Sequence, residues 1–364
     1  MRILNVYVTK NFLSTGFVAI VVLTFGLMGV NLIKIFEFMS RGIPFSSASA
    51  FLFFLMPTAF SLTIPVSILV SVMLVFGRLS ADNEITAMRA CGISILQIIS
   101  PIIIITFGLT CLCLYLQLEL APFFSSKAKD LIKGVGVMYP LAILEPGRPI
   151  EYENFNIYID DRVGENGLKD IQVFILSKDR TKVEQDITAT KGRIEVDSEK
   201  EIMNIILENA TVKIAETTGD PPRITFSKEM EFGIDYGKNF NKMHIGEKPH
   251  FMTLKELFGS TKFMRGKGES TTKLEVELNQ RIALGLSPIA FLLLGLPLAI
   301  RTSRRETSVN LFLSVILAGA YFISIMIFQA FDTKPQYHPE LLLWIPNIVY
   351  QAGGIYFLFK IART

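Results

Sequence analysis

The sequence lacks any Asp, Glu, Lys or Arg in six long apolar runs. These runs are Phe12–Ile33, Phe51–Phe76, Ile95–Leu118, Ile282–Ile300, Val309–Ala330 and Leu341–Phe359. A helix needs about 20 apolar residues to cross roughly 30 Å of hydrocarbon, so each run predicts a membrane-spanning helix. Pro57 and Pro65 predict a kinked or tilted second helix. Ion-coupled transporters usually place ionisable groups at mid-membrane depth, so their absence argues against ion-driven transport.

The sequence also lacks the patterns that mark an enzyme or a metal site. It has no Gly-x-x-x-x-Gly-Lys-Ser/Thr loop and no Gly-x-Ser-x-Gly turn. The few histidines and cysteines show no metal-ligand spacing, and none of the cysteines falls in the large polar block: His244, His250, His338, Cys91, Cys111 and Cys113. No dense Lys/Arg stripe accompanies the net charge of +3, which excludes a nucleic-acid footprint. We therefore expect no catalytic residue, no metal and no cofactor.

The basic residues in the short loops predict how the chain is oriented in the membrane. With the N-terminus in the cytoplasm, nine cations fall on the cytoplasmic side: Arg2, Lys10, Arg78, Arg89, Arg301, Arg304, Arg305, Lys360 and Arg363. The opposite short loops carry three: Lys34, Arg41 and Lys334. Cytoplasmic loops are enriched in Lys and Arg, so both termini are expected in the cytoplasm of a bacterial cell, below its inner membrane. The polar block from about Glu119 to Thr272 is then periplasmic.

This polar block is typical of an antiparallel β domain. Short β-branched and aromatic segments recur between turn residues: Asn156–Ile159, Ile171–Leu176, Ile187–Thr190, Ile194–Val196, Ile202–Leu207, Thr211–Ile214 and Ile224–Phe226. Their spacing favours a sandwich or jelly roll. The expected fold is therefore an integral membrane α-helical protein of six transmembrane helices with an inserted periplasmic antiparallel β jelly-roll-like domain.

The block ends in segments that lead into the fourth span. Thr253-Leu-Lys-Glu256 has the pattern of a capping box and predicts a short helix. Gly259–Thr272 is rich in small and polar residues and is expected to be flexible. Lys273–Arg281 predicts a further helix, in which Glu277 and Arg281 can pair across one turn. The organisation we expect is 1–118 (three spans), 119–272 (the β domain) and 273–364 (the connecting helix and three spans).

A loop between the second and third spans could contact a cytoplasmic partner. Gly77–Ser94 predicts a short amphipathic helix at about 79–92, with Ala81, Ile85 and Met88 on one face and Gly92 as its terminator. Such a helix can dock in a groove of another protein. The alternative is an interfacial helix that lies on the membrane.

Lys34 and Arg41 follow the first span on the side where positive charge is depleted. Two cations at headgroup level could hold a phosphate or another anionic amphiphile. The alternative is that both side chains simply reach the interface, as long basic side chains do near the ends of spans.

Several segments together resemble one known family, the lipopolysaccharide export permeases of the LptF/LptG type. They are Asn31–Glu37, Asn83–Gly92, Glu119–Pro122, Met252–Leu257 and Gly295–Leu298. The resemblance covers essentially the whole chain. The order of these segments, with three spans on either side of a β domain, is more specific than any one of them.

The resemblance implies a mechanism and partners. Two such permeases pair above a cytoplasmic ABC ATPase dimer, take lipopolysaccharide into an apolar cavity between them, and expel it into a periplasmic β-jellyroll bridge. It implies that Glu84, with its neighbours Ile85, Met88 and Arg89, couples to the ATPase. It also implies that Lys34 contacts the lipid phosphates, as a basic residue at this place does in the G-type permease; Arg41 matches the family less well and is expected as a second cation at the rim of the cavity. Whether the chain is the F or the G type, and whether it pairs with itself or a paralogue, stays open.

Three other functions remain possible from the residues. One is an ABC permease for lipoproteins or another envelope lipid, although such permeases usually have four spans with the domain after the first. Another is an envelope-assembly scaffold without a transport cycle, and a third is a secondary transporter. Co-purification with an ATPase separates the first two.

Overall fold

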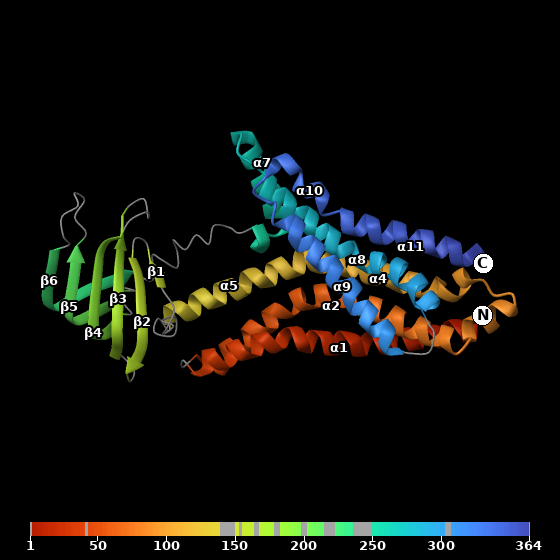
Figure 1. Ribbon diagram of the computed structural model, residues 1–364, viewed down its shortest axis with the longest axis horizontal. Coiled ribbons are helices and arrows are strands. Elements are labelled where there is room, and N and C mark those ends of the chain that lie inside the picture. The colour runs from red at the N-terminus through yellow and green to blue at the C-terminus, as the bar shows by residue number, and fades with distance from the viewer. Residues whose placement is uncertain are drawn as a thin grey trace. The chain divides into compact units, whose positions relative to one another are not determined.

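The computed structural model describes residues 2–40, 43–138, 150–152, 155–163, 167–177, 183–197, 202–214, 223–235, 249–302 and 307–363. The chain forms two compact units, a mainly helical one (1–34, 50–128 and 247–364) and a second one (35–49 and 129–246) that carries the β-sheet. The helices before the sheet are α1 (Arg2–Ser40), α2 (Phe45–Ala81), α3 (Glu84–Ala90), α4 (Ile95–Tyr115), the π-helix η1 (Leu116–Leu120) and α5 (Ala121–Met138). Those after it are η3 (Pro249–Phe251), α7 (Leu254–Lys267), α8 (Thr272–Thr302), α9 (Thr307–Gln329), η4 (Pro335–Tyr337), α10 (Pro339–Leu342) and α11 (Ile345–Arg363) (Figure 1).

The six predicted spans are confirmed as helices that are long and apolar enough to cross a membrane. They run over Ile3–Phe36, Phe45–Ala81, Ile95–Ile132, Thr272–Arg301, Ser308–Gln329 and Pro339–Ile361. Several extend past the apolar runs because the helix continues into polar sequence. α2 continues as one helix through Pro57 and Pro65. α2 and α8 are the most buried spans, at 78% and 67% of their apolar windows, so these two helices form the interior of the bundle.

A polar and aromatic cluster joins α8, α9 and α11 inside the bundle. The fully buried Tyr321 hydroxyl donates to the carbonyl of Ala283 at 3.1 Å and to Asn347 Oδ1 at 3.2 Å. The Asn347 side-chain amide donates to the same carbonyl at 2.8 Å. The rings of Phe291 and Tyr350 lie 4.9 and 5.5 Å from the Tyr321 ring. Because buried polar groups need partners where no water is available, this cluster helps to fix how the three helices pack.

Gly354 marks the closest approach of α11 to α8. A Cβ atom there would lie 2.7 Å from the Leu294 amide nitrogen and closer still to the Leu293 carbonyl. Small residues let membrane helices approach in this way. We expect Gly354→Val to cost about 1–3 kcal/mol of stability through overpacking. Gly319→Val in α9, where a Cβ would meet nothing within 4 Å, is the matched control. Unfolding temperatures in detergent should separate the two variants, and equal values would contradict this packing.

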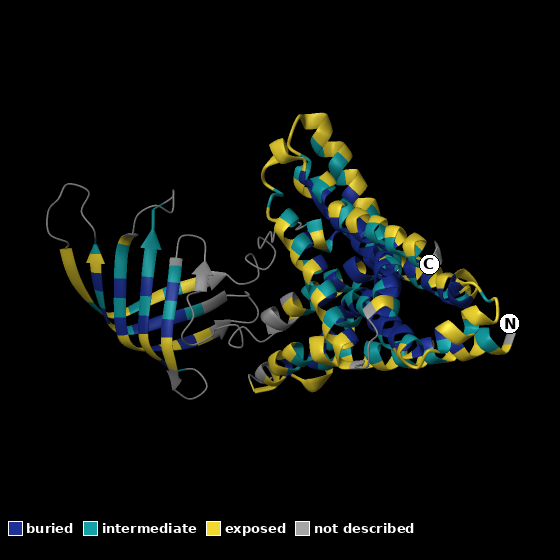
Figure 2. Cartoon of the chain, turned by 45° about the vertical axis from the view of Figure 1, so that its right-hand side comes forward, coloured by how far each residue is buried: buried dark blue, intermediate teal, exposed yellow. Residues whose placement is uncertain are grey.

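The predicted antiparallel β domain is confirmed as one six-stranded sheet in the order β1 to β6. Its strands are β1 (Ile150–Tyr152), β2 (Phe155–Val163), β3 (Gly167–Leu176), β4 (Val183–Asp197), β5 (Ile202–Ile214) and β6 (Arg223–Asp235). Each pairs with the next, so the described strands form a meander and not the two facing sheets of a sandwich. The register aligns the buried residues Ile157, Val173 and Ile187 across three strands. Figure 2 shows these buried positions in the middle of the strands.

The seven short predicted segments correspond to five longer strands, and β1 was missed. Lys191–Arg193 looked like a turn, but Gly192 lies inside β4. A Cβ at Gly192 would meet Ile171 Cδ1 at 2.5 Å, so the glycine makes room for a neighbouring side chain. Asn209 has φ of 52° yet lies inside β5. Turn-forming residues therefore mark irregular points of long strands here, and not their ends.

The segment before the fourth span is helical where flexibility was expected. The capping box is confirmed: the Thr253 hydroxyl accepts from the Glu256 amide at 3.5 Å, and the Glu256 carboxylate accepts from the Thr253 amide at 2.8 Å. α7 then continues through Gly259 to Lys267, so the prediction of a flexible Gly259–Thr272 was wrong for most of its length. Gly268, with φ of 73°, ends the helix in a left-handed cap. The buried Leu257 packs with Met252 and Leu274, which compensates for the glycines.

Candidate functional site

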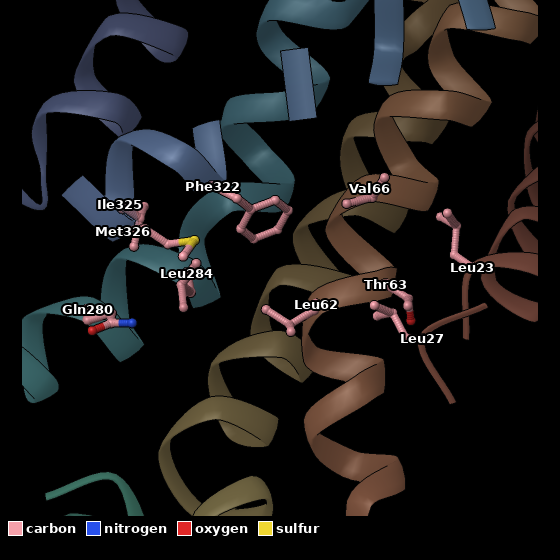
Figure 3. A pocket seen from close by; sticks show the side chains of 10 residues that line it. All are labelled: Leu23, Leu27, Leu62, Thr63, Val66, Gln280, Leu284, Phe322, Ile325 and Met326. Carbon is pink, nitrogen blue, oxygen red and sulfur yellow. The ribbon is translucent and has the colours of Figure 1, made fainter. Parts of the chain in front are cut away.

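An apolar pocket of about 450 Å³ opens between two pairs of helices in the helical unit. One wall comes from α1 and α2, and the other from α8 and α9 (Figure 3). Ten residues line it: Leu23, Leu27, Leu62, Thr63, Val66, Gln280, Leu284, Phe322, Ile325 and Met326. The volume falls in the range of roughly 300–1,000 Å³ that small-molecule sites occupy. A predominantly apolar lining between membrane helices suits a hydrocarbon chain.

Two polar residues lie in this otherwise apolar lining. Thr63 is held by the Thr24 hydroxyl, 3.1 Å away on α1. Gln280 Nε2 donates to Gln329 Oε1 at 3.2 Å, which links α8 to α9. Gln280 lies just before the fourth apolar run and Gln329 at the end of the fifth, so this amide pair marks one end of the pocket.

Lys34 is exposed and lies on the pocket-lining side of α1. Leu23, Leu27 and Lys34 are spaced by four and seven residues, which places them within about 40° of one another around a helix. Lys34 is therefore about 10 Å beyond Leu27 along α1. One predicted headgroup ligand thus lies on the same side of α1 as the pocket but does not line it. Arg41, the other, lies outside the described residues.

The predicted amphipathic helix exists as α3, but it is shorter than 79–92. α2 continues through Ala81, and α3 begins at Glu84 after Asn83 adopts a left-handed conformation with φ of 57°. The helix ends at Ala90 with Cys91 as its C-cap, and the predicted terminator Gly92 follows in a left-handed conformation with φ of 80°. The Gly92 and Ile93 amides donate to the carbonyls of Arg89 and Met88 at 2.9 and 3.1 Å.

The apolar side of α3 packs on this chain's own core. Ile85 is only 4% exposed and belongs to the bundle core, and Met88 packs against that core. The Tyr7 hydroxyl donates to Glu84 Oε1 at 3.4 Å, and Arg89 is exposed. Ile85 and Met88 are therefore not free to enter a partner's groove. The residues that α3 exposes are Thr86, Ala87, Arg89 and Ala90, and Glu84 is partly exposed.

The family of the chain was identified by comparing its sequence with those of known protein families. The sequence pattern of the lipopolysaccharide export system permease LptF/LptG matches residues 6–360. The chain belongs to this LptF/LptG family. A comparison with curated proteins gave no match. At family level the chain is thus a lipopolysaccharide export permease, which is a transporter component. Membership also confirms the resemblance read from the sequence segments.

A buried ion pair lies at the start of the fourth span. Arg281 Nε lies 2.8 Å from Glu277 Oε1, as the spacing predicted, and the two side chains are 4% and 10% exposed. The Arg281 guanidinium also donates to the carbonyls of Met252, Pro249 and His250 at 2.7, 2.9 and 3.0 Å. His250 Nδ1 lies 3.4 Å from the same Glu277 oxygen. This Arg281 cluster fastens the segment that returns from the β domain onto α8.

Several residues of the site carried no signal in the sequence. Leu23, Leu62 and Phe322 look like any other apolar residue of a span, because a lipid-facing side chain and a pocket-facing one are equally hydrophobic. The carbonyl partners of Arg281 are backbone atoms that residue types do not reveal. Among the described residues, no group of three or more His, Cys, Asp or Glu side chains could hold a metal.

Proposed function

We propose that this permease takes lipopolysaccharide from the bacterial inner membrane and passes it to a periplasmic β-jellyroll bridge for export to the outer membrane. The apolar pocket carries the proposal. It offers an acyl-chain site between α1–α2 and α8–α9, and Lys34 lies on the same face of α1 about two turns beyond Leu27. A cation at that position is placed to bind a phosphate of the lipid head. Arg41 is proposed to act beside it.

The energy is proposed to come from a cytoplasmic ABC ATPase dimer. The six apolar runs contain no ionisable side chain that could relay a coupling ion. α3 joins two spans on the side where both termini are expected, and its polar residues Glu84 and Arg89 are left for a partner by the inward packing of Ile85 and Met88. Closure of the ATPase would then move α2 and α4 together.

Two further partners complete the proposal. A second permease of the same family would close the pocket from the membrane side. Large apolar residues are exposed along α1 and α9, among them Phe17, Phe25 and Phe312. In the sheet, β6 is an edge strand with Ile224 and Phe226 exposed, which suits strand addition by a bridge protein. Both termini are proposed to be cytoplasmic and the β domain periplasmic.

Filling the pocket tests this function. Leu62→Trp places a large ring in the pocket, so we expect about tenfold less lipopolysaccharide to co-purify with the variant, equivalent to ~1.4 kcal/mol. Leu112→Trp is the matched control, because Leu112 is 44% exposed on the outer side of α4. The measurement is bound lipopolysaccharide per mole of protein by mass spectrometry. Equal lipid in both variants and the wild type would contradict the pocket as the acyl-chain site.

A further inference from the structure

α7 presents an exposed face whose composition is unusual for a solvated helix. Its inner side is fixed by Leu257 and Met264, which pack with Met252 and Leu274. Its outer side carries two large exposed aromatic side chains, Phe258 at 56% and Phe263 at 64%. The cations of the helix are Lys255, Lys262, Arg265 and Lys267, against a single acid, Glu256, that is used in the capping box. The outer side therefore combines positive charge with aromatic surface.

Four of these residues form one basic stripe: Lys255, Phe258, Lys262 and Arg265. Their spacing of three, four and three residues keeps them within about 80° around the helix and spreads them over about 15 Å along it. Arg265 is held in place by Glu275, 2.8 Å away on α8. Glu275 also accepts from the Thr271 hydroxyl at 2.8 Å. The two lysines at the start and middle of the stripe are exposed.

Two glycines leave bare helix surface beside the stripe. Gly259 and Gly266 lie within about 40° of Lys255 around the helix. A Cβ atom at either position would meet nothing within 4 Å. Glycine costs about 1 kcal/mol relative to alanine inside a helix, so the pair lowers the stability of α7 without serving any internal contact. The result is a flat surface that lies between Phe258 and Phe263 around the helix, on which a ring can lie.

The direction of α7 selects between possible occupants. The helix begins beside the Arg281 cluster, since the Met252 carbonyl accepts from Arg281, just outside the apolar run that starts at Ile282. Its last turn lies beside the first turn of α8, since Arg265 pairs with Glu275. α7 therefore runs antiparallel to α8 and away from the hydrocarbon (Figure 1). A bilayer surface would contact a helix that lies flat, whereas this stripe suits an elongated ligand that leaves the membrane.

We infer that the basic stripe binds the phosphorylated saccharide head of the exported lipid, an inference that rests on the proposed function. Lys255 and Lys262 bind phosphate groups, and Arg265 offers the remaining face of its guanidinium. Phe258 packs against a sugar ring that lies over the bare surface at Gly259. The stripe is distinct from the pocket and from Lys34, because it recognises the head beyond the membrane and not the acyl chains.

The test uses a ligand that cannot enter the pocket. The probe is the phosphorylated oligosaccharide obtained from lipopolysaccharide by removal of all acyl chains, titrated against the full-length protein in nanodiscs. We expect Lys255→Glu/Lys262→Glu to weaken its binding about tenfold, or ~1.4 kcal/mol. Lys267→Glu/Lys273→Glu changes the charge equally on the same hairpin but off the stripe, and is expected to bind like the wild type. The dephosphorylated oligosaccharide should bind all variants weakly.

Each other outcome overturns the inference. If the stripe variant and the wild type bind the oligosaccharide with equal affinity, the stripe does not bind it. If the control variant loses as much affinity as the stripe variant, the loss reflects the overall charge of the hairpin and not the stripe. If the stripe variant instead loses only a co-purifying bridge protein, the occupant is a protein. If it loses only binding to vesicles containing phosphatidylglycerol, the occupant is the membrane. Leu62→Trp should leave oligosaccharide binding unchanged, so failure of the pocket and failure of the stripe are distinguishable.

Discussion

Arg281→Met is expected to lower the free energy of unfolding by about 3–5 kcal/mol, because removing one partner of a buried ion pair leaves the other charge uncompensated. The remaining charge is the Glu277 carboxylate, whose side chain is 10% exposed and which keeps the longer contact of 3.4 Å with His250 Nδ1. The carbonyls of Pro249, His250 and Met252 lose their donors at the same time. An unpartnered buried polar group carries its own desolvation penalty, so the losses add to that of the charge.

Two further variants separate the causes. Glu277→Gln/Arg281→Met removes the unpaired charge and should recover part of the loss, while the three carbonyls remain without donors. Arg265→Met breaks a similar 2.8 Å pair with Glu275, but the Arg265 side chain is 73% exposed, so we expect at most about 1 kcal/mol. Unfolding temperatures and denaturant curves in one detergent provide the comparison. If Arg281→Met and Arg265→Met were equally mild, the Arg281 cluster would not be a structural centre.

The cluster also has a consequence for transport. Pro249–Met252 is the stretch at which the chain returns to the bundle after the β domain, and Arg281 fastens it to the fourth span. In the proposed transport cycle, a shift of α8 would be transmitted to this stretch, and through α7 to the basic stripe.

The sequence was most informative where one physical force dominates. Charge-free runs of about 20 residues predict spans because hydrocarbon excludes charge, and all six are helices in the structure. The Glu277–Arg281 pair and the Thr253 capping box were found because both depend on fixed helical spacing. Gly92 was predicted as the terminator of α3 because glycine readily adopts the left-handed conformation that follows a helix.

The failures arise where tertiary contacts override local preference. α7 passes through Gly259 because Leu257 and Met264 anchor it, although the local sequence favours a flexible loop. Gly192 and Asn209 fell between predicted strand segments, but the neighbouring strands hold them inside β4 and β5. The family resemblance implied an apolar cavity between two permeases, and a pocket within one chain was not predicted. Its lining could not be assigned because period and hydrophobicity do not say which apolar side chain faces a void.

α3 shows how the structure changes a functional prediction without removing it. The helix was predicted to offer an apolar face to a groove, but Ile85 and Met88 are occupied by the core of this chain. Its attachment to the bundle is further fixed by the hydrogen bond from Tyr7 to Glu84 and, just before it, by the Ser80 hydroxyl, which donates to the Ile300 carbonyl at 2.9 Å. A helix fixed in this way can transmit force to the spans, and Glu84 and Arg89 are the charged residues with which the proposed ATPase would recognise it.

Charge reversal at Glu84 should therefore disrupt the complex with the ATPase and leave the permease folded. We expect Glu84→Lys to reduce ATPase co-purification by more than tenfold, since like charges brought together at an interface cost several kcal/mol. The unfolding temperature should change little, because Glu84 is only partly buried and its 3.4 Å hydrogen bond to Tyr7 is weak. Tyr7→Phe removes that hydrogen bond alone and should keep the complex intact.

Glu119→Lys is the matched control, because Glu119 is exposed on η1, at the end of the third apolar run that is remote from α3. It makes the same change of charge where no ATPase is expected. The assay is affinity purification of the permease with its ATPase at several salt concentrations, followed by ATP turnover. A contact made through charge should weaken further as salt rises. Unchanged co-purification and turnover in Glu84→Lys would show that α3 is held by its own bundle and contacts no ATPase, and the energy source would then have to reach the spans by another route.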